Sequence, residues 1–293
     1  MAGGIGVAVG AAIVWGGYLF YLKRAFADYA ASTLTVLING FALLWYLPVV
    51  LADLGVGGAI SAVVDLNAAQ VGVVALTAVM VAGAMIAFLR ALAVGEVSYV
   101  APISKIVPVF VLPIEILALG QVLTPLEVAG VVVATAAVYV ANFRGGSVFD
   151  PLRRATTSPA ARLAILSAMA FGVSDVARRV GLQELAIPVG LWVPLVLGGV
   201  GAVLLPSAVR AGVPATVRAD LPKLAAGGLL VAAGESLTNI AFSLVPASIA
   251  SPIINTQAVV AVLLGGLLLD ERQFGVRLVA AGLAVVGVTM IAV

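Results

Sequence analysis

The chain has 293 residues, of which 63% are hydrophobic and only 10% are charged, and its formal net charge is +2. Because soluble domains carry about 25% charged residues, this composition predicts a multi-pass membrane protein with little mass outside the lipid. The chain contains no cysteine and no histidine, which excludes disulfides, thiol catalysis, imidazole proton relays and metal sites built on those residues.

Ten apolar segments follow one another along the chain, each close to the roughly 20 residues that cross a bilayer as a helix. In chain order they are 3–22, 31–52, 69–90, 97–119, 124–143, 161–183, 187–209, 223–245, 247–269 and 274–293. Their helical spacing and their lack of strict alternation favour helices over a barrel. We therefore predict an all-α integral membrane protein with ten transmembrane helices, the first retained and not cleaved as a signal peptide.

A polar stretch at residues 144–159 divides the chain into two halves of five segments each. The halves share a pattern: residues 97–103 read VSYVAPI, and residues 247–253, 150 positions on, read ASIASPI. Either this is chance similarity between Ala/Val-rich helices, or the halves are repeats. A five-helix repeat enters the membrane inverted in its second copy, a common transporter plan with the substrate site between the repeats. We expect a first repeat at 1–146, a linker at 147–160 and a second repeat at 161–293.

The fourth and ninth segments carry polar residues at matching positions on one helical face. These residues are Ser98, Pro102 and Lys105 in the fourth segment and Ser248, Pro252 and Asn255 in the ninth. Each proline removes a backbone donor and frees a carbonyl about one turn back, so Pro102 and Pro252 are either hinges of a transport path or simple kinks. Because a buried ammonium is costly in a membrane, we predict that Lys105 and Asn255 line one central cavity.

Glu235 lies near the middle of the apolar segment 223–245, where a carboxylate costs about 2.5–3.5 kcal/mol. It shares a helical face with Asn239, four residues on. Two roles are open. An isolated buried carboxylate can load and release a coupling proton near neutral pH, or Glu235 is the permanent counter-ion of Lys105.

Other polar residues admit structural explanations. Asp175 can pair within its own helix with Arg178 and Arg179, at i+3 and i+4, and the two arginines can also snorkel to the interface. Glu115 lies near the end of its segment on a different face from Lys105, and exposure at the membrane interface would account for it.

Four short motifs occur in order along the chain. They are Val14-Trp15-Gly16, the segment holding Ser98 and Pro102, Ile254-Asn255-Thr256-Gln257, and Leu269-Asp270-Glu271-Arg272. Their order resembles the drug/metabolite transporter superfamily, specifically its EamA-like ten-helix group, over essentially the whole chain. Asp270 departs from the glycine of the family's corner motif, and Gln121 departs from the glutamate of its first-half counterpart. The resemblance implies a secondary transporter that moves small metabolites or drugs.

We therefore expect a secondary transporter, an exporter, of small polar or amphipathic metabolites such as amino acids, working by alternating access in the plasma or inner membrane. Proton coupling is left open. The candidate substrate-binding residues are Trp15, Tyr18, Ser98, Lys105, Asn239, Ser248, Asn255 and Gln257, with Glu235 for proton coupling and Pro102 and Pro252 as hinges. Trp15 and Tyr18 form an aromatic wall of the path or, alternatively, anchor at the interface.

Two other functions compete. An anion or phosphate-ester exchanger would use Lys105 with Arg178 or Arg179 as anchors. A membrane-embedded enzyme acting on lipid-linked substrates is less favoured, because the acids are scattered and histidine is absent. No Lys-Ser or Lys-Thr follows a glycine-rich loop, so an ATP-driven pump is excluded. We expect no catalytic residue, metal, cofactor or nucleic-acid partner; the partners are a small-molecule substrate, lipid and, in the coupled case, protons.

Loop charges predict the orientation in the membrane. Ten spans place both termini on one side. The basic residues of the loops on the opposite side are Lys23, Arg24, Arg90, Arg144, Arg153, Arg154, Arg162, Arg210, Arg218, Lys223, Arg272 and Arg277. The positive-inside rule therefore predicts that the termini lie outside, whereas the family resemblance suggests that they lie in the cytoplasm.

Overall fold

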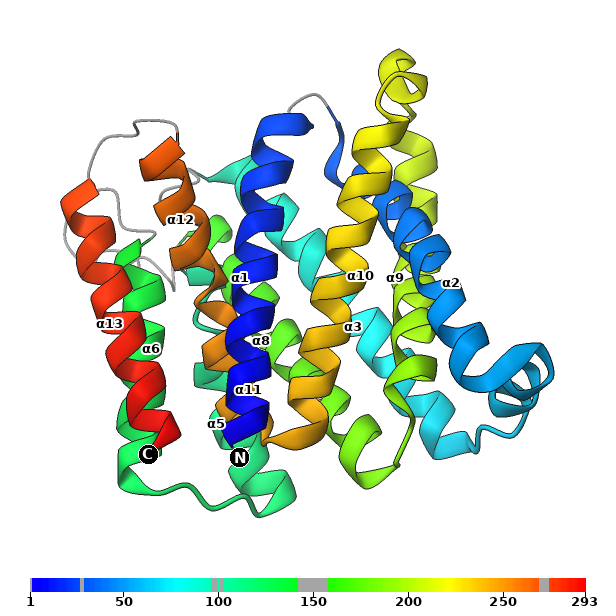
Figure 1. Ribbon diagram of the computed structural model, residues 1–293. Helices are drawn as coiled ribbons and strands as arrows, with labels where there is room; N and C mark the ends of the chain where they lie inside the picture. The colour runs from blue at the N-terminus through cyan, green and yellow to red at the C-terminus, as the bar shows by residue number, and fades with distance from the viewer. Residues whose placement is uncertain (1, 27–28, 96–99, 101–102, 142–157, 269–273) are drawn as a thin grey trace.

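The computed structural model describes residues 2–26, 29–95, 100, 103–141, 158–268 and 274–293, and all regular structure in these residues is helical (Figure 1). The first half contains α1 (Ala2–Ala25), α2 (Ala31–Val64), α3 (Ala68–Val94), α5 (Val107–Leu119) and α6 (Pro125–Ala141). The second half contains α8 (Pro159–Arg179), the π-helix η1 (Val180–Glu184), α9 (Val189–Ala211), the 3₁₀-helix η2 (Ala215–Arg218), α10 (Leu221–Leu244), α11 (Ala247–Asn255), α12 (Gln257–Leu268) and α13 (Phe274–Ala292).

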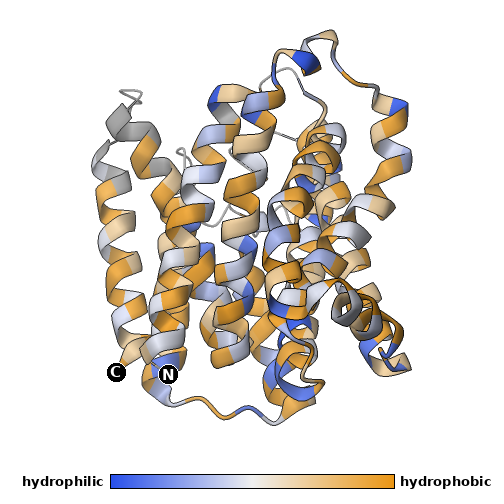
Figure 2. Cartoon of the chain, turned by 45° about the vertical axis from the view of Figure 1, so that its right-hand side comes forward, coloured by the Kyte–Doolittle hydropathy of each residue, from blue (hydrophilic) through white to orange (hydrophobic). Residues whose placement is uncertain are grey.

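The chain is a multi-pass membrane protein. Within the described residues, six helices are long and apolar enough to cross a bilayer: α1, α2, α3, α8 with η1, α9 and α10. The shorter apolar helices, α5, α6, α11 with the start of α12, and α13, stand among them. Apolar residues cover most of the length of the bundle (Figure 2). Both chain ends lie at the same end of it (Figure 1), and we call this end the terminus side.

The helices of the two halves interleave instead of forming separate bundles. Helix α3 packs against α8, and α10 packs against α1; α5 packs against α8, and α12 packs against α1. Helix α2 packs against α9, and α6 packs against α13. When each helix is exchanged for its counterpart in the other half, α3–α8 becomes α10–α1 and α5–α8 becomes α12–α1, while α2–α9 and α6–α13 stay the same pairs.

Close contacts at two glycines show the same correspondence between the halves. A Cβ on Gly16 of α1 would lie 2.5 Å from Val260 Cβ of α12. A Cβ on Gly172 of α8 would lie 2.9 Å from Phe110 Cβ of α5. Phe110 and Val260 are 150 positions apart, the same offset as the sequence similarity. In both places the absence of a side chain lets two helices approach closely, as small residues do in membrane bundles.

We expect Gly16→Ala to destabilise the protein and Gly17→Ala to leave it unchanged or slightly more stable. The new methyl group at Gly16 would also lie 2.9 Å from the carbonyl oxygen of Gln257, whereas nothing lies within 4 Å at Gly17. Overpacking of this kind costs about 1–3 kcal/mol, and alanine is otherwise the better helix former at both sites. Thermal unfolding in detergent measures the difference; equal melting temperatures for the two variants would contradict the packing.

Helix α2 is longer than its predicted segment, 31–52. It bends at Gly55, which has φ 66° and ψ 172°, and continues to Val64. Glycine tolerates this positive φ because it has no Cβ. The part after the bend extends sideways from the bundle on the terminus side (Figure 1), which the apolar pattern alone did not indicate.

The predicted continuous helices at 97–119 and 247–269 are interrupted, which corrects both. In the first, Lys105 and Ile106 lie outside the helix, and α5 begins at Val107. In the second, Thr256 separates α11 from α12. Ile106 and Thr256 are 150 positions apart, so the interruptions occupy corresponding positions. Interrupted helices in the middle of a transporter are where its ligand sites are built.

Candidate functional site

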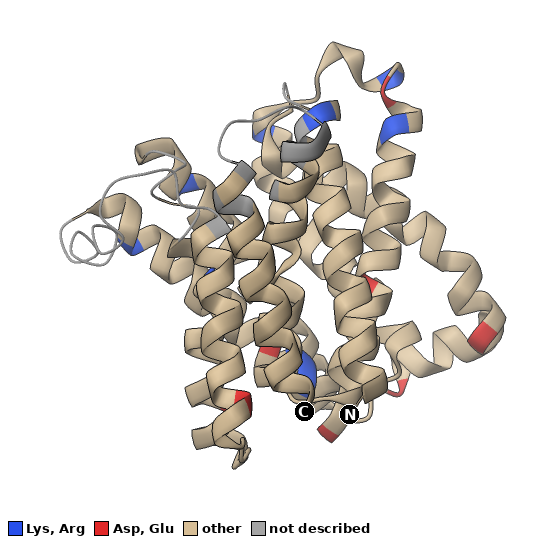
Figure 3. Ribbon diagram, turned by 60° about the vertical axis from the view of Figure 1, so that its left-hand side comes forward, with Lys and Arg blue, Asp and Glu red and all other residues tan. Residues whose placement is uncertain are grey.

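A cluster of charged side chains lies in the bundle interior, where α5, α8, α10 and α11 meet. Among the described residues its members are the cations Lys105, Arg178 and Arg179 and the anions Glu115, Asp175 and Glu235. Each is buried or half-buried, and the formal charges sum to zero. Along the rest of the bundle charged residues are few and lie mostly toward its two ends (Figure 3).

Glu235 pairs with Arg178. The distance from Arg178 Nη1 to Glu235 Oε2 is 3.0 Å, and the two side chains are 7% and 15% exposed. Asn239 Nδ2 donates to the same carboxylate oxygen at 3.0 Å. Arg178 also stacks over the ring of Phe242, 5.6 Å from its centroid, a favourable cation–π position. The predicted pairing of Glu235 with Lys105 is therefore wrong, because α8 supplies the cation.

Asp175 connects the interrupted helices. Its carboxylate accepts a hydrogen bond from Ser251 Oγ at 2.5 Å, and it is close enough to Lys105 to interact electrostatically. Asn255 Nδ2 in turn donates to Ser251 Oγ at 3.3 Å and to the Ser251 carbonyl at 2.9 Å. Lys105 and Asn255 thus belong to one polar network, linked through Asp175 and Ser251. That they line a cavity stays a prediction.

Glu115 is fully buried, and the expectation that it is exposed at the interface is wrong. Its two oxygens accept the backbone N–H groups of Ala247 and Ser248, each at 2.7 Å. These are the first two residues of α11, where N–H groups have no partner within the helix and the dipole favours an anion. Arg179 Nε lies 3.4 Å from Glu115 Oε1.

The π-helix η1 extends this network to the end of α10. Gln183 Nε2 donates to the carbonyl oxygens of Phe242 at 2.6 Å and Val245 at 2.9 Å, and Arg179 Nε donates to Gln183 Oε1 at 3.2 Å. Arg179 therefore links α8, the end of α10 and the start of α11. Short π-helical turns often mark functional positions. Asp175 interacts electrostatically with Arg178 of its own helix, as expected, but the two arginines form their ion pairs with Glu235 of α10 and Glu115 of α5.

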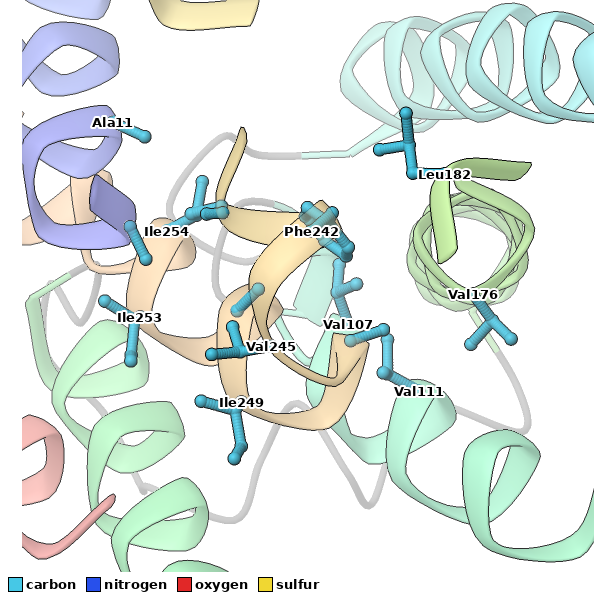
Figure 4. Packing of buried hydrophobic residues seen from close by; sticks show 14 of the residues in the cluster. Ala11, Val107, Val111, Val176, Leu182, Phe242, Val245, Ile249, Ile253 and Ile254 are labelled. Carbon is cyan, nitrogen blue, oxygen red and sulfur yellow. The ribbon is translucent and has the colours of Figure 1, made fainter. Parts of the chain in front are cut away.

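Apolar side chains surround the charged cluster on the same helices. Phe242 of α10 and Val245, the residue that follows this helix, pack with Ile249 and Ile253 of α11 (Figure 4). Val107 and Val111 of α5 and Val176 of α8 belong to the same buried group. A packed apolar wall lowers the local dielectric, which strengthens each ion pair and makes an unpaired charge costly.

The predicted aromatic pair faces the interior. Trp15 Nε1 donates to Thr238 Oγ1 of α10 at 2.9 Å, and its ring meets Tyr18 edge to face with centroids 5.5 Å apart. The indole covers Gly234, where a Cβ would lie 2.8 Å from Trp15 Cε2. Trp15 is therefore held beside the turn of α10 that carries Glu235 and is not an interface anchor.

The other predicted residues occupy related positions. Asn239 and Ser248 are buried, and neither Asn239 Oδ1 nor Ser248 Oγ has a hydrogen-bond partner among the described residues. Pro252 is buried within α11, and Gln257 begins α12. Ser98 and Pro102 lie outside the described residues.

Sequence reasoning gave Glu115 and Arg179 mainly structural explanations and did not single out Gln183 or Ser251. A signal was present for the first three, because a charge or an amide within an apolar segment needs a partner. What the sequence did not give was the partner, which in each case comes from another helix.

Comparisons with known proteins extend these observations. The profile of the EamA-like transporter family matches residues 2–143 and 158–293. A solved structure, described only as the crystal structure of a protein, is 16% identical and superposes with a TM-score of 0.79 over 99% of this chain and 96% of its own. At this identity the likeness concerns the fold alone. No curated protein matches the chain.

Proposed function

Because the chain belongs to the EamA-like transporter family, we propose that it is a secondary active transporter in the plasma or inner membrane that exports small polar or amphipathic metabolites by alternating access. That it is a membrane transporter of the drug/metabolite type with a small-molecule substrate follows from the family. Direction, substrate class and coupling are our proposal. The chain is not proposed to catalyse a reaction.

The proposed architecture is ten spans in two inverted repeats, residues 1–146 and 161–293, joined by a linker at 147–160. Two observations support it. The family profile matches once in each half, and the helix pairs exchange when the halves are exchanged. Inverted repeats place the substrate site at their interface near the membrane midplane. The charged cluster supports this plan because it combines helices of both halves, α5 from the first with α8, α10 and α11 from the second.

The single observation that carries the proposal is the polar network beside the two interruptions. Lys105 and Ile106 interrupt one helix and Thr256 interrupts the other. Asp175 of α8 accepts a 2.5 Å hydrogen bond from Ser251 of α11 and interacts electrostatically with Lys105. A structural scaffold would gain little from these charges, because buried ion pairs are weak stabilisers compared with apolar packing. A transporter uses them as exchangeable partners for a polar substrate.

Proton coupling is proposed at the Arg178–Glu235 pair. With Glu235 ionised, the pair is closed by a 3.0 Å contact. A proton on Glu235 removes the negative charge and frees the guanidinium for a carboxylate of the substrate. Loss of the proton closes the pair again and expels that carboxylate. Proton and substrate therefore load together and leave together, and export by this route is driven by the outward concentration gradient of the substrate.

The charge balance favours zwitterions over strongly charged anions. Each cation of the cluster has an acidic neighbour: Arg178 has Glu235, Arg179 has Glu115, and Lys105 has Asp175. A substrate with one ammonium and one carboxylate, such as an amino acid, can replace such a pair without leaving a net charge. The phosphate-ester exchanger is supported less, because it would need cations in excess.

Uptake into proteoliposomes tests the proposal. Purified protein is reconstituted, and radiolabelled amino acids, other zwitterions and phosphate esters are offered with and without a pH gradient. We expect gradient-dependent accumulation of at least one zwitterion and none of the phosphate esters. Transport of phosphate esters alone would replace the proposal by the anion exchanger, and no transport of any compound would count against both.

We expect both termini to lie outside the cell. Among the described residues, those exposed at the end opposite the termini include the cations Arg24, Arg90, Arg210 and Arg218, whereas acids prevail on the terminus side (Figure 3). The positive-inside rule places the basic end in the cytoplasm. A C-terminal alkaline phosphatase fusion should be active and a C-terminal GFP fusion dark; the reverse pair would place the termini inside.

A further inference from the structure

The first turn of α11 holds a carboxylate that comes from another helix. Glu115 of α5 accepts the N–H groups of Ala247 and Ser248, one on each oxygen, at 2.7 Å. Arg179 Nε approaches the same carboxylate at 3.4 Å. Two helix N-terminal donors and a guanidinium therefore converge on one anionic group, which is the arrangement of an anion-binding site.

This site offers more donors than Glu115 uses. Ser248 Oγ belongs to the residue whose N–H binds Glu115, is 1% exposed, and has no hydrogen-bond partner in the described part of the chain. Arg179 Nη1 is likewise buried and unpartnered among those residues. A contact built only to fix α5 against α11 gains nothing from leaving buried donors unpaired. A ligand with further acceptor atoms would use them.

Helix α5 begins directly after an interruption and contains a proline. Lys105 and Ile106 separate it from the preceding residues, and Pro113, two positions before Glu115, lies inside it. Proline removes a hydrogen bond within a helix and kinks it. Thr256 likewise interrupts the chain at the C-terminal end of α11. The Glu115 contact therefore joins two short helices that are each bounded by an interruption.

We propose that the first turn of α11, with Arg179 and Ser248, is a carboxylate-binding site, and that Glu115 occupies it in this conformation. Its role rests on the proposed function: a carboxylate of the substrate displaces Glu115, separates α5 from α11 and opens the path toward the terminus side. One anion replaces another beside Arg179, so the exchange leaves the charge of the site unchanged.

Thermal unfolding of the purified full-length chain tests the site without any transport assay. In Glu115→Ala the carboxylate that fills the site is absent. Propionate, a monocarboxylate with the carbon chain of the whole glutamate side chain, should raise the melting temperature progressively with concentration, as ligands of the native state do. Propionamide at equal ionic strength should not. The wild type should respond much less than Glu115→Ala, because propionate must compete with Glu115 for the site, and Glu115→Ala with Arg179→Met should lose the response.

An equal response of wild type and Glu115→Ala, or no response of Glu115→Ala, overturns the proposal. If Glu115→Ala cannot be recovered folded, propionate in the growth medium and buffers should restore it and propionamide should not; failure with both overturns the proposal as well. Uptake by the wild type is measured separately. A propionate response without transport keeps the site and rejects the proposed function, whereas transport without the response keeps the function and rejects the site.

Discussion

Replacing Arg178 by methionine is expected to lower the free energy of unfolding by about 3–5 kcal/mol, the cost of leaving a buried charge without its partner. Methionine keeps much of the length and apolar contact of the side chain but removes the guanidinium that lies 3.0 Å from Glu235. The Glu235 carboxylate, 15% exposed, would retain only the amide of Asn239 as a donor at that oxygen.

The double variant Arg178→Met with Glu235→Gln is expected to recover most of this loss, because no unpaired charge remains. Lys223→Met provides the matched control: Lys223 pairs with Asp220 at 2.7 Å, but its side chain is 53% exposed, and exposed pairs contribute about 0–1 kcal/mol. Unfolding curves in a denaturing detergent compare the four proteins. A double variant as unstable as Arg178→Met would show that the pair is not what holds α8 to α10.

Replacing Lys105 by methionine is expected to weaken substrate binding by more than tenfold, which corresponds to about 1.4 kcal/mol. Lys105 lies at the interruption before α5, where no regular helix fixes its backbone, and its charged neighbour is Asp175. If its ammonium holds a carboxylate of the substrate, its loss removes a charge-assisted hydrogen bond in a buried place.

Two comparisons separate this role from a structural one. Arg90→Met removes an exposed cation at the end of α3 and should leave binding unchanged. Lys105→Arg keeps the charge and should retain part of the affinity. Binding of the transported compound to detergent-purified protein, by calorimetry or scintillation proximity, measures all three. Unchanged affinity of Lys105→Met would remove Lys105 from the binding residues.

The apolar periodicity located the helices well, because in lipid a long apolar run has helix as its main solution. It failed where backbone geometry intervenes. Gly55 bends α2 without ending it, and Thr256 interrupts a segment whose composition does not change there. The ends of such helices also depend on tertiary contacts, as the first turn of α11 depends on Glu115 of α5, and the local sequence does not reveal those contacts.

The residues of the polar site were likewise predictable only in part. Glu235 and Lys105 were identifiable because isolated charges stand out in apolar segments. Their partners were not, because helical spacing relates residues only within one helix. Arg178 is three residues from Asp175 along α8, yet its nearest acid is Glu235 of α10. Which helices face one another is decided by packing at positions such as Gly16 and Gly172, many residues away.

Accumulation and counterflow by Glu235→Gln test the central claim, that the Arg178–Glu235 pair couples a proton to substrate movement. Glutamine keeps the shape of the side chain but cannot carry the proton. In sealed proteoliposomes with a pH gradient, the wild type should concentrate its substrate and Glu235→Gln should not, while both exchange labelled for unlabelled substrate. Gradient-driven accumulation by Glu235→Gln at the wild-type level would contradict the account.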